Sequence, residues 1–578
     1  RLGDSFLAQG AILTDILVAL AVFYYTCIRF RRYWIALLEA IQLGAVLWFE
    51  YVSHGTLDYY ADIIVDNFTL IMILIAGVIG SLIAVFSLGY MEAFQREHRD
   101  VRDRRSFFFF VLFLFLSAMF GLVISNNLLY MYTCWEITSV CSFLLIGYTE
   151  SRVAVNNSFK ALWMNLLGGA AFAAAIIIMG LTYHSTALSH LVGLALAGMP
   201  VTVILALLLL CGFTKSAMMP FSGWLLGAMV APTPTSALLH SSTMVKAGVF
   251  LIIKLCPALG NNHAGTMAMF VGGITFFFAS CAAISQSDGK KVLAYSTISN
   301  LGLIVCCAGI GSYEAAWTAI MIVIFHAVAK SLLFLSVGTA EQQLGSRDIE
   351  RFDGLFNAMP HLCLCMVIGI SGMFLAPFGM LISKWAAMKA FIDAGHPMLL
   401  LLLVFGSATT IFYWAKWLGK ILSVMNGQER REQGITKGEW FTLKTLSWMT
   451  IIVCILFPLI SSYGVLPYLR ITYGFTRDVI AQSNLIIMSL MVVLLVILPS
   501  RYGKGQPKRK VGALLAGVNT GDDRNYRGAG DNIIPVELRN WYIEEWFGEK
   551  KMKLSGFALC MACIFIQFAI ILGGVYRG

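Results

Sequence analysis

Charge is scarce in this sequence. Only 12% of the 578 residues are Asp, Glu, Lys or Arg, whereas a soluble globular domain carries about 25%. No hydrophilic stretch is long enough to form a catalytic domain, and the apolar runs lack the apolar–polar alternation that a membrane β-barrel requires. With 59% hydrophobic residues and a mean hydropathy of +0.79, the sequence predicts an all-α polytopic membrane protein.

Cysteine motifs that could bind a redox cluster are nearly absent as well. The 13 cysteines are scattered, and a CxxC spacing occurs only at Cys560 and Cys563, inside an apolar run where packing is the simpler interpretation. Iron–sulfur and nickel–iron centres need sets of thiolates, so we expect no cofactor and no metal in this chain. The formal net charge of +10 resides in short loops, which suits lipid head groups and not nucleic acid.

Long apolar runs dominate the sequence instead. A transmembrane helix needs about 20 apolar residues, and about 16 stretches meet that requirement. They are expected to begin near residues 10, 34, 63, 106, 127, 160, 199, 235, 265, 291, 314, 360, 397, 446, 483 and 554.

The loops between these runs carry their positive charge on one side. The loop RFRRY at 29–33 is basic and therefore predicted to be cytoplasmic. By parity the same side receives the other basic loops, at 92–105, 287–291, 341–354, 415–445 and 500–553. The opposite loops at 54–62 and 183–198 contain no Lys or Arg, and the exception is 468–482, with Arg470 and Arg477. The N-terminus is therefore expected outside.

Two of the expected spans, 199–231 and 360–395, are too long for one helix. Each contains a lysine and a proline near its middle, namely Lys215 with Pro220 and Lys384 with Pro377. They are the seventh and twelfth spans, and an odd offset gives them opposite orientations. Paired broken helices of this kind indicate inverted repeats with a transport site near mid-membrane. Pro232 is a third expected helix-breaking residue.

The chain is accordingly expected to have five regions. They are residues 1–105 (helices 1–3), 106–257 (a first repeat, helices 4–8), 258–425 (a second, inverted repeat, helices 9–13), 426–500 (helices 14–15) and 501–578 (a polar, Gly-rich cytoplasmic or interfacial segment and a final anchor). The last region could be a tether alongside neighbouring subunits or a plain anchored tail.

Ionisable residues inside the expected spans are the candidate site. Glu136 is one of the few acids well inside a span, and Glu39 is another. A lone buried carboxylate would take up a proton, whereas a nearby lysine would hold it ionised, so Glu136 and Lys215 can form a switchable acid–base pair. The alternative is a static salt bridge that ties helices together.

Two further spans combine histidine with lysine. His240 and Lys246 share one span, and His326 and Lys330 lie four residues apart on one helix face. Histidine titrates near neutral pH and can relay protons, although a buried histidine can also serve packing alone. Together with Glu136, Lys215 and these two histidine–lysine spans, Lys384 would complete a row of ionisable residues inside the membrane. Other lysines near span ends, Lys254, Lys389 and Lys416, are expected to extend toward the interface, and Asp66 is expected to be an interface residue.

These residues lie in motifs that resemble a known family. The motifs are CWEITSVCSFLLIGY, GFTKSAMMPFSGWLLGAMVAPTPTSALLHSSTMVKAG, KKVLAYSTISNLGLI, FHAVAKSLLFLSVG and the SKW of the twelfth span. They are similar to the antiporter-like subunits of respiratory complex I, Mrp-type cation/proton antiporters and energy-converting membrane hydrogenases, over roughly residues 60–425. The resemblance implies an input pair at Glu136 and Lys215, connecting elements at Lys246 with His240 and at Lys330 with His326, and an output lysine at Lys384.

The C-terminal tail resembles the large antiporter-like subunit of Ech-type and formate-hydrogenlyase-type hydrogenases. That resemblance implies a proton-translocating, non-redox subunit of a redox-driven complex in a prokaryotic inner membrane. Other membrane subunits and peripheral redox subunits holding nickel–iron and iron–sulfur centres would be its partners, and ferredoxin would act indirectly. The alternatives are a distal complex I subunit, an Mrp-type Na⁺/H⁺ antiporter subunit and a non-conducting membrane scaffold, with H⁺ or Na⁺ as the ion.

Overall fold

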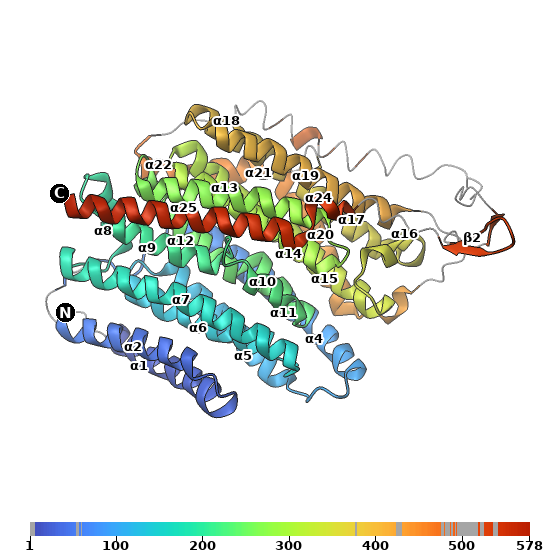
Figure 1. The fold of residues 1–578 in the computed structure, drawn as a ribbon, viewed down its shortest axis with the longest axis horizontal. Helices are drawn as coiled ribbons and strands as arrows, with labels where there is room; N and C mark the ends of the chain where they lie inside the picture. Colours follow the sequence, from blue (N-terminus) through green and yellow to red (C-terminus); the bar gives the residue numbers. More distant parts are fainter. Residues whose placement is uncertain are drawn as a thin grey trace.

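In the computed structural model the chain is a bundle of helices that run in roughly the same direction (Figure 1). The structure describes residues 6–53, 57–58, 60–375, 379–423, 431–475, 479, 486, 489–491, 493, 497, 518–520, 525–535 and 542–577. Among these residues, 13 helices are long and apolar enough to cross a membrane, or 14 if the pair Lys437–Ile455 and Phe457–Tyr473, bent by 63°, is one span. The all-α membrane fold is therefore confirmed.

The count differs from the expected 16 for identifiable reasons. The seventh expected span ends early, because helix α9 (Thr202–Lys215) has only 14 residues before the chain turns. The stretch expected to span from residue 483 lies largely outside the described residues. The bend at Leu456 was not predicted; Pro458 follows it in the first turn of the next helix, where proline is tolerated.

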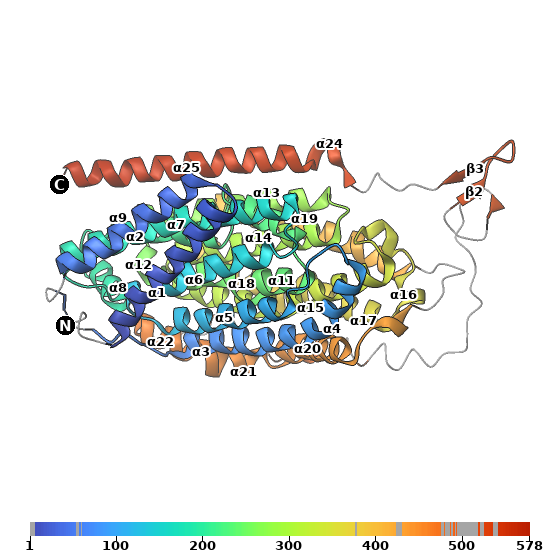
Figure 2. The same cartoon turned by 90° about the horizontal axis from the view of Figure 1, so that it is seen from below.

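The N-terminal part consists of long helices in sequence order. They are α1 (Phe6–Phe23) with the π-helical η2 (Tyr24–Arg29), α2 (Tyr33–Ser53), α3 (Asn67–Leu74) with η3 (Ile75–Ile79), α4 (Gly80–Glu97), α5 (Arg105–Ile124), α6 (Leu128–Ile146), α7 (Arg152–Tyr183) and the short α8 (Leu188–Leu196). Helices α1 and α2 lie side by side at the lower edge of the bundle in Figure 1, and in Figure 2, which is seen from below, they lie in front of it.

The middle of the chain holds the broken helices and the core. Its elements are α9, α10 (Gly223–Gly227), η4 (Ala228–Val230), α11 (Thr233–Ala237), η5 (Leu238–Ser242), α12 (Met244–Leu259), α13 (His263–Ile284), α14 (Gly289–Ile310) and α15 (Tyr313–Leu344). The most apolar stretches of α14 and α15 are entirely buried by neighbouring helices. These two helices therefore form the centre of the bundle.

The remaining helices surround this centre. They are η6 (Ile349–Phe352), α16 (Leu355–Ala358), α17 (Pro360–Phe374), α18 (Gly379–Asp393), α19 (Pro397–Leu422), η7 (Glu432–Gly434), α20 (Lys437–Ile455), α21 (Phe457–Leu459), η8 (Ile460–Val465), α22 (Leu466–Tyr473), α24 (Glu544–Phe547) and α25 (Glu549–Arg577). Pro377, the predicted break in the twelfth span, lies outside the described residues, between α17 and α18.

Local sequence explains where many helices start. Polar side chains accept a hydrogen bond from the first helical turn at Asn127, Ser151, Asn262, Asp288, Ser312 and Thr436. These residues satisfy backbone N–H groups that a helix start leaves unpaired. At α20, Thr436 and Glu439 form a reciprocal capping box.

The C-terminal region packs on its own chain. Helix α25 runs along the outside of the bundle (Figure 2) and contacts α13, where Cys560 Sγ lies 3.8 Å from Thr275 Oγ1 and Gln567 Oε1 lies 3.1 Å from His263 Nδ1. Before it, strands β1 (Val518–Asn519), β2 (Asn525–Arg527) and β3 (Ile533–Pro535) form a small antiparallel sheet in sequence order, which protrudes beyond one end of the bundle (Figure 2). Strands were not predicted there.

Candidate functional site

Lys215 ends helix α9 and is completely buried. Its ammonium nitrogen donates hydrogen bonds to the Trp135 carbonyl (2.9 Å) and to Ser139 Oγ (2.7 Å) on α6, and lies 5.0 Å from the centre of the Trp135 ring. A cation at a helix C-terminus also interacts favourably with the free carbonyls there. Three kinds of neutral group therefore solvate this charge in place of water.

Glu136 follows Trp135 on α6 and is buried, with 3% of its surface exposed. Neither of its carboxyl oxygens has a hydrogen-bond partner among the described residues. Lys215 thus donates a hydrogen bond to the carbonyl of Trp135, the residue before Glu136, and does not form a direct ion pair with the acid. Ser139 and the Trp135 carbonyl are the lysine's partners that the sequence did not indicate, because a carbonyl has no residue-specific signal.

The break after Lys215 is stabilised by specific hydrogen bonds. The Trp224 indole donates to the Thr214 carbonyl (2.8 Å), and the Met219 amide donates to Thr275 Oγ1 on α13 (3.1 Å). Pro220 lies in this turn, and Pro232 precedes the first residue of α11. Irregular backbone inside a membrane persists only where protein or trapped water satisfies it.

The two His–Lys helices contact each other across the bundle. Lys246 Nζ on α12 lies 3.0 Å from His326 Nδ1 on α15. His240 sits in the π-helical turn η5, with its ring 5.2 Å from that of Phe334, and neither of its ring nitrogens has a hydrogen-bond partner in the described structure. Lys246 is therefore bonded to the histidine of the other helix and not to the histidine of its own span.

Lys330 continues the row toward α14 and α19. Its ammonium donates to the Leu293 carbonyl (3.1 Å) and lies 4.9 Å from the centre of a Trp414 ring. Ser331 beside it donates to Ser241 Oγ at 2.7 Å, which joins α15 to η5. The buried polar residues of the two helices are thus linked side chain to side chain.

Lys384 lies on α18 and is buried, with 7% of its surface exposed. Its ammonium faces the ring of Phe276 on α13, 5.7 Å from the ring centre. Lys389 lies five residues further along and donates to the Val479 carbonyl (3.3 Å).

We expect Lys384→Ala to lower ion translocation about tenfold, equivalent to about 1.4 kcal/mol, while the protein still assembles with its partners. The reason is that an intramembrane lysine contributes charge but little packing. Translocation by reconstituted protein, with Lys389→Ala as the control on the same helix, measures this. Failure of Lys384→Ala to assemble would contradict the expectation.

Lys254 and Asp66, which were expected to be interface residues, form a partly buried ion pair in the structure. Lys254 Nζ bonds the Asp66 carboxylate and lies 5.2–5.8 Å from the ring centres of Phe68, Phe250 and Tyr468. Asp66 also caps α3 by accepting from the Thr69 amide (2.8 Å). The pair fixes α12 to the start of α3, a long-range contact that sequence spacing does not reveal.

Removing one partner of this partly buried pair leaves an uncompensated charge. Lys254→Met should therefore lower the free energy of unfolding by about 2–3 kcal/mol, measured by thermal unfolding in detergent. Adding Asp66→Asn, which keeps an oxygen for the cap, should restore part of the loss. A double variant as unstable as the sum of the singles would contradict this.

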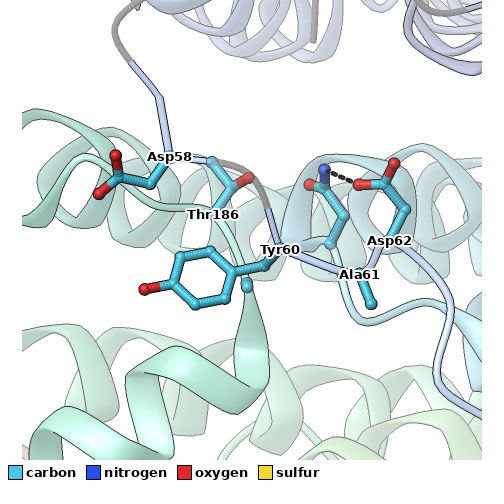
Figure 3. A pocket seen from close by; sticks show the side chains of 7 residues that line it. Asp58, Tyr60, Ala61, Asp62 and Thr186 are labelled. Carbon is cyan, nitrogen blue, oxygen red and sulfur yellow. Dashed lines mark hydrogen bonds between the residues drawn. The ribbon is translucent and has the colours of Figure 1, made fainter. Parts of the chain in front are cut away.

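A pocket lies where three loops meet near one end of the bundle (Figure 3). It is lined by Asp58, Tyr60, Ala61, Asp62, Asn127, Thr186 and Ala187. Asn127 Nδ2 donates to Asp62 Oδ1 at 2.9 Å, and the Asp58 and Asp62 carboxylates point away from each other (Figure 3). This arrangement ties loops together and does not form a convergent site.

The fold and the site together define a polytopic membrane protein with a row of buried lysine, histidine and glutamate side chains through its core. Residues 125–410 match the family described as NADH:quinone oxidoreductase/Mrp antiporter, transmembrane, and residues 48–108 match complex I chain 5, N-terminus. The chain belongs to the antiporter-like subunit family of complex I and Mrp antiporters.

Curated relatives include Na⁺/H⁺ antiporter subunit A1 of Staphylococcus haemolyticus, 33% identical over 386 residues, covering 63% of this chain and 47% of the relative. Subunit A1 of Staphylococcus aureus is 33% identical over 398 residues, with coverages of 64% and 49%. The chain thus spans about half the length of the curated relatives it matches.

Two solved structures share the fold. An Mrp complex from Dietzia matches with a TM-score of 0.64 and 24% identity, covering 86% of this chain and 57% of that chain. An archaeal membrane-bound sulfane sulfur reductase, a respiratory membrane complex, matches with a TM-score of 0.64 and 20% identity, covering 85% of this chain and 99% of that chain. Both relatives are subunits of multi-subunit membrane complexes.

Proposed function

We propose that the chain is an ion-translocating subunit of a multi-subunit membrane complex and that the ion is the proton. The observation that carries the proposal is the buried row itself: Lys215, Lys246, His326 and Lys330 are each completely buried. Burial of so many ionisable groups is costly and is retained where they carry or steer ions.

The mechanism follows from coupling between neighbouring sites. The protonation of each lysine or histidine changes the energy of a proton on the next one, because charges at short range in a poorly polarisable interior interact strongly. Lys215 can exchange its Trp135 and Ser139 partners for Glu136, which changes the charge at one end of the row. The Lys246–His326 bond then passes the change to the second half, and Lys384 releases or receives the proton.

The fold pattern that supports this mechanism is the pair of interrupted helices, α9 with α10 and α17 with α18. We propose that they belong to two inverted five-helix repeats within residues 106–257 and 258–425. Basic loops on one side place the N-terminus outside a prokaryotic inner membrane in this proposal.

Two kinds of complex remain candidates for the subunit. The 33% identity to Na⁺/H⁺ antiporter subunits A1 favours an Mrp-type complex that exchanges Na⁺ for H⁺. The near-complete coverage of a chain in a respiratory complex, 99%, and the resemblance of the tail favour a redox-driven complex, with an Ech-type hydrogenase and its nickel–iron and iron–sulfur subunits as the specific candidate.

Purification of the tagged chain from its native membrane distinguishes the two. We expect it to bring along other membrane subunits together with peripheral subunits that contain iron, detected by mass spectrometry and metal analysis. Co-purification of membrane subunits alone, with Na⁺-dependent proton movement in proteoliposomes, would select the Mrp-type assignment. Purification as a single chain without any translocation would favour the scaffold.

A further inference from the structure

A cavity lies between α1, α2 and α6, at the edge of the bundle. It is lined by Asp15, Val18, Glu39, Leu43, Val46, Tyr132 and Glu136. Its three acidic residues come from three different helices. Two of those helices, α1 and α2, carry none of the residues in the row described above.

All three carboxyl groups are more than nine-tenths buried, with exposed fractions of 7% for Asp15, 5% for Glu39 and 3% for Glu136. Asp15 accepts one hydrogen bond from Thr133 Oγ1 (3.1 Å). Its other oxygen, Glu39 Oε2 and both oxygens of Glu136 have no hydrogen-bond partner in the described structure. Unpartnered buried acceptors are rare because each costs its lost hydration.

The side-chain oxygen of Gln42 lies close to the Glu136 carboxyl group. The amide nitrogen of Gln42 donates to the Leu166 carbonyl (2.8 Å), so the oxygen is directed to the other side, where the Tyr132 hydroxyl donates to it at 3.3 Å. This oxygen and Glu136 Oε1 both lie over the backbone of Gly169 on α7, in the space that a Cβ would occupy. Both oxygens lie within 2.7 Å of that point, and of the two only the Gln42 oxygen has a donor in the described structure, so Glu136 is the group that lacks a proton donor.

A proton fits better than a metal ion. In the part of the chain that the structure describes, no three His, Cys, Asp or Glu side chains are placed to hold a metal. Three carboxylates around one cavity repel one another when all are ionised, and the repulsion is relieved when they share protons. The cavity has room for about one water molecule between the carboxyl groups.

We propose that Asp15 and Glu39 load protons onto Glu136 through this cavity. A carboxylic acid on α1 or α2 gives its proton to the Glu136 carboxylate, directly or through a water, and is itself reprotonated by the next proton. The other ionisable neighbours are Lys215 and Cys211 on α9, Cys134 and Tyr132 on α6, and Glu50, which lies further along α2 outside the cavity lining. This inference rests on the proposed function, and it gives α1 and α2 a role in it.

The first test is translocation by the reconstituted complex. Glu39→Gln and Asp15→Asn should each lower the rate at least about tenfold at neutral pH, because a group that transfers protons contributes about a hundredfold or more. Glu39→Asp, which keeps a carboxyl group, should retain most of the rate and shift its pH profile. Glu92→Gln, at an exposed glutamate on α4 far from the cavity lining, is the control and should translocate normally. Normal translocation by Glu39→Gln across the neutral pH range would overturn the proposal.

The second test separates this inference from the proposed function. Infrared difference spectra of the purified full-length protein during a pH titration should contain a C=O band from protonated buried carboxyl groups. The band should shrink in Glu39→Gln and in Asp15→Asn, and should persist in Lys330→Ala, which is expected to stop translocation. A wild-type protein without such a band, or a band unchanged in both acid variants, would overturn the shared-proton cluster whatever the translocation result.

Discussion

Lys215→Ala should lower ion translocation about a hundredfold or more, the usual contribution of a positioned proton-transfer group. The substitution removes the ammonium that α6 holds with the Trp135 carbonyl and Ser139, and leaves Glu136 without a positive charge nearby. Lys215 lies in the last turn of α9, where alanine is well tolerated, and the break after it is stabilised by the Trp224 and Met219 hydrogen bonds, so the break and the fold should persist. The measurement is the quenching of a pH-sensitive dye by proteoliposomes that contain the purified complex.

Lys444→Ala is the control for this experiment, because Lys444 is an exposed lysine on a membrane helix and lies outside the row. Glu136→Gln, which keeps the size of the side chain and removes its charge, should impair translocation as Lys215→Ala does. Full-rate translocation in both variants would reject the transport function and leave the scaffold interpretation.

The bond between Lys246 and His326 leads to the second prediction. Lys246→Met and His326→Gln should each reduce translocation about a hundredfold, since either change removes the side-chain hydrogen bond that joins α12 to α15. The double variant should be no slower than the worse single variant, because residues that act as a unit give strongly non-additive effects.

His263→Ala serves as the histidine control, since His263 is exposed and contacts Gln567 on α25. Additive losses in the Lys246→Met, His326→Gln double variant would show that the two groups act in separate steps. That outcome would contradict a single relay through their bond and would favour two independent paths.

The sequence predicted the membrane class and most of the spans because both depend on local composition. A run of about 20 apolar residues predicts a transmembrane helix wherever it occurs in the chain. A lysine within such a run can be recognised from the sequence alone. The helix break after Lys215 was also predictable, since Pro220 and the excess length of the apolar stretch are both local signals. The short α9 and the bend before Phe457 were not, because they depend on which neighbours satisfy the free backbone groups.

The partners of the buried charges could not be predicted in the same way. The motif spacing suggested pairing within a helix, His326 with Lys330 and His240 with Lys246, whereas the structure bonds Lys246 to His326. Lys254 was expected to extend toward the interface, and nothing in the sequence indicated that its partner would be Asp66, which lies almost 190 positions earlier in the chain. Backbone carbonyls such as those of Trp135 and Leu293 carry no residue-specific signal at all.

The sequence by itself therefore determined that this is a polytopic antiporter-like protein with charges inside its spans, since apolar length and the residue types are written in each segment. Only the tertiary structure decided how those charges are solvated. It bonded Lys215 to the carbonyl of Trp135 and not to Glu136, and it bonded Lys246 of one helix to His326 of the other. It also brought Asp15, Glu39 and Glu136 together around one cavity. The physical reason is that a buried charge is stabilised by whatever polar atoms the packing of distant helices brings within hydrogen-bond distance.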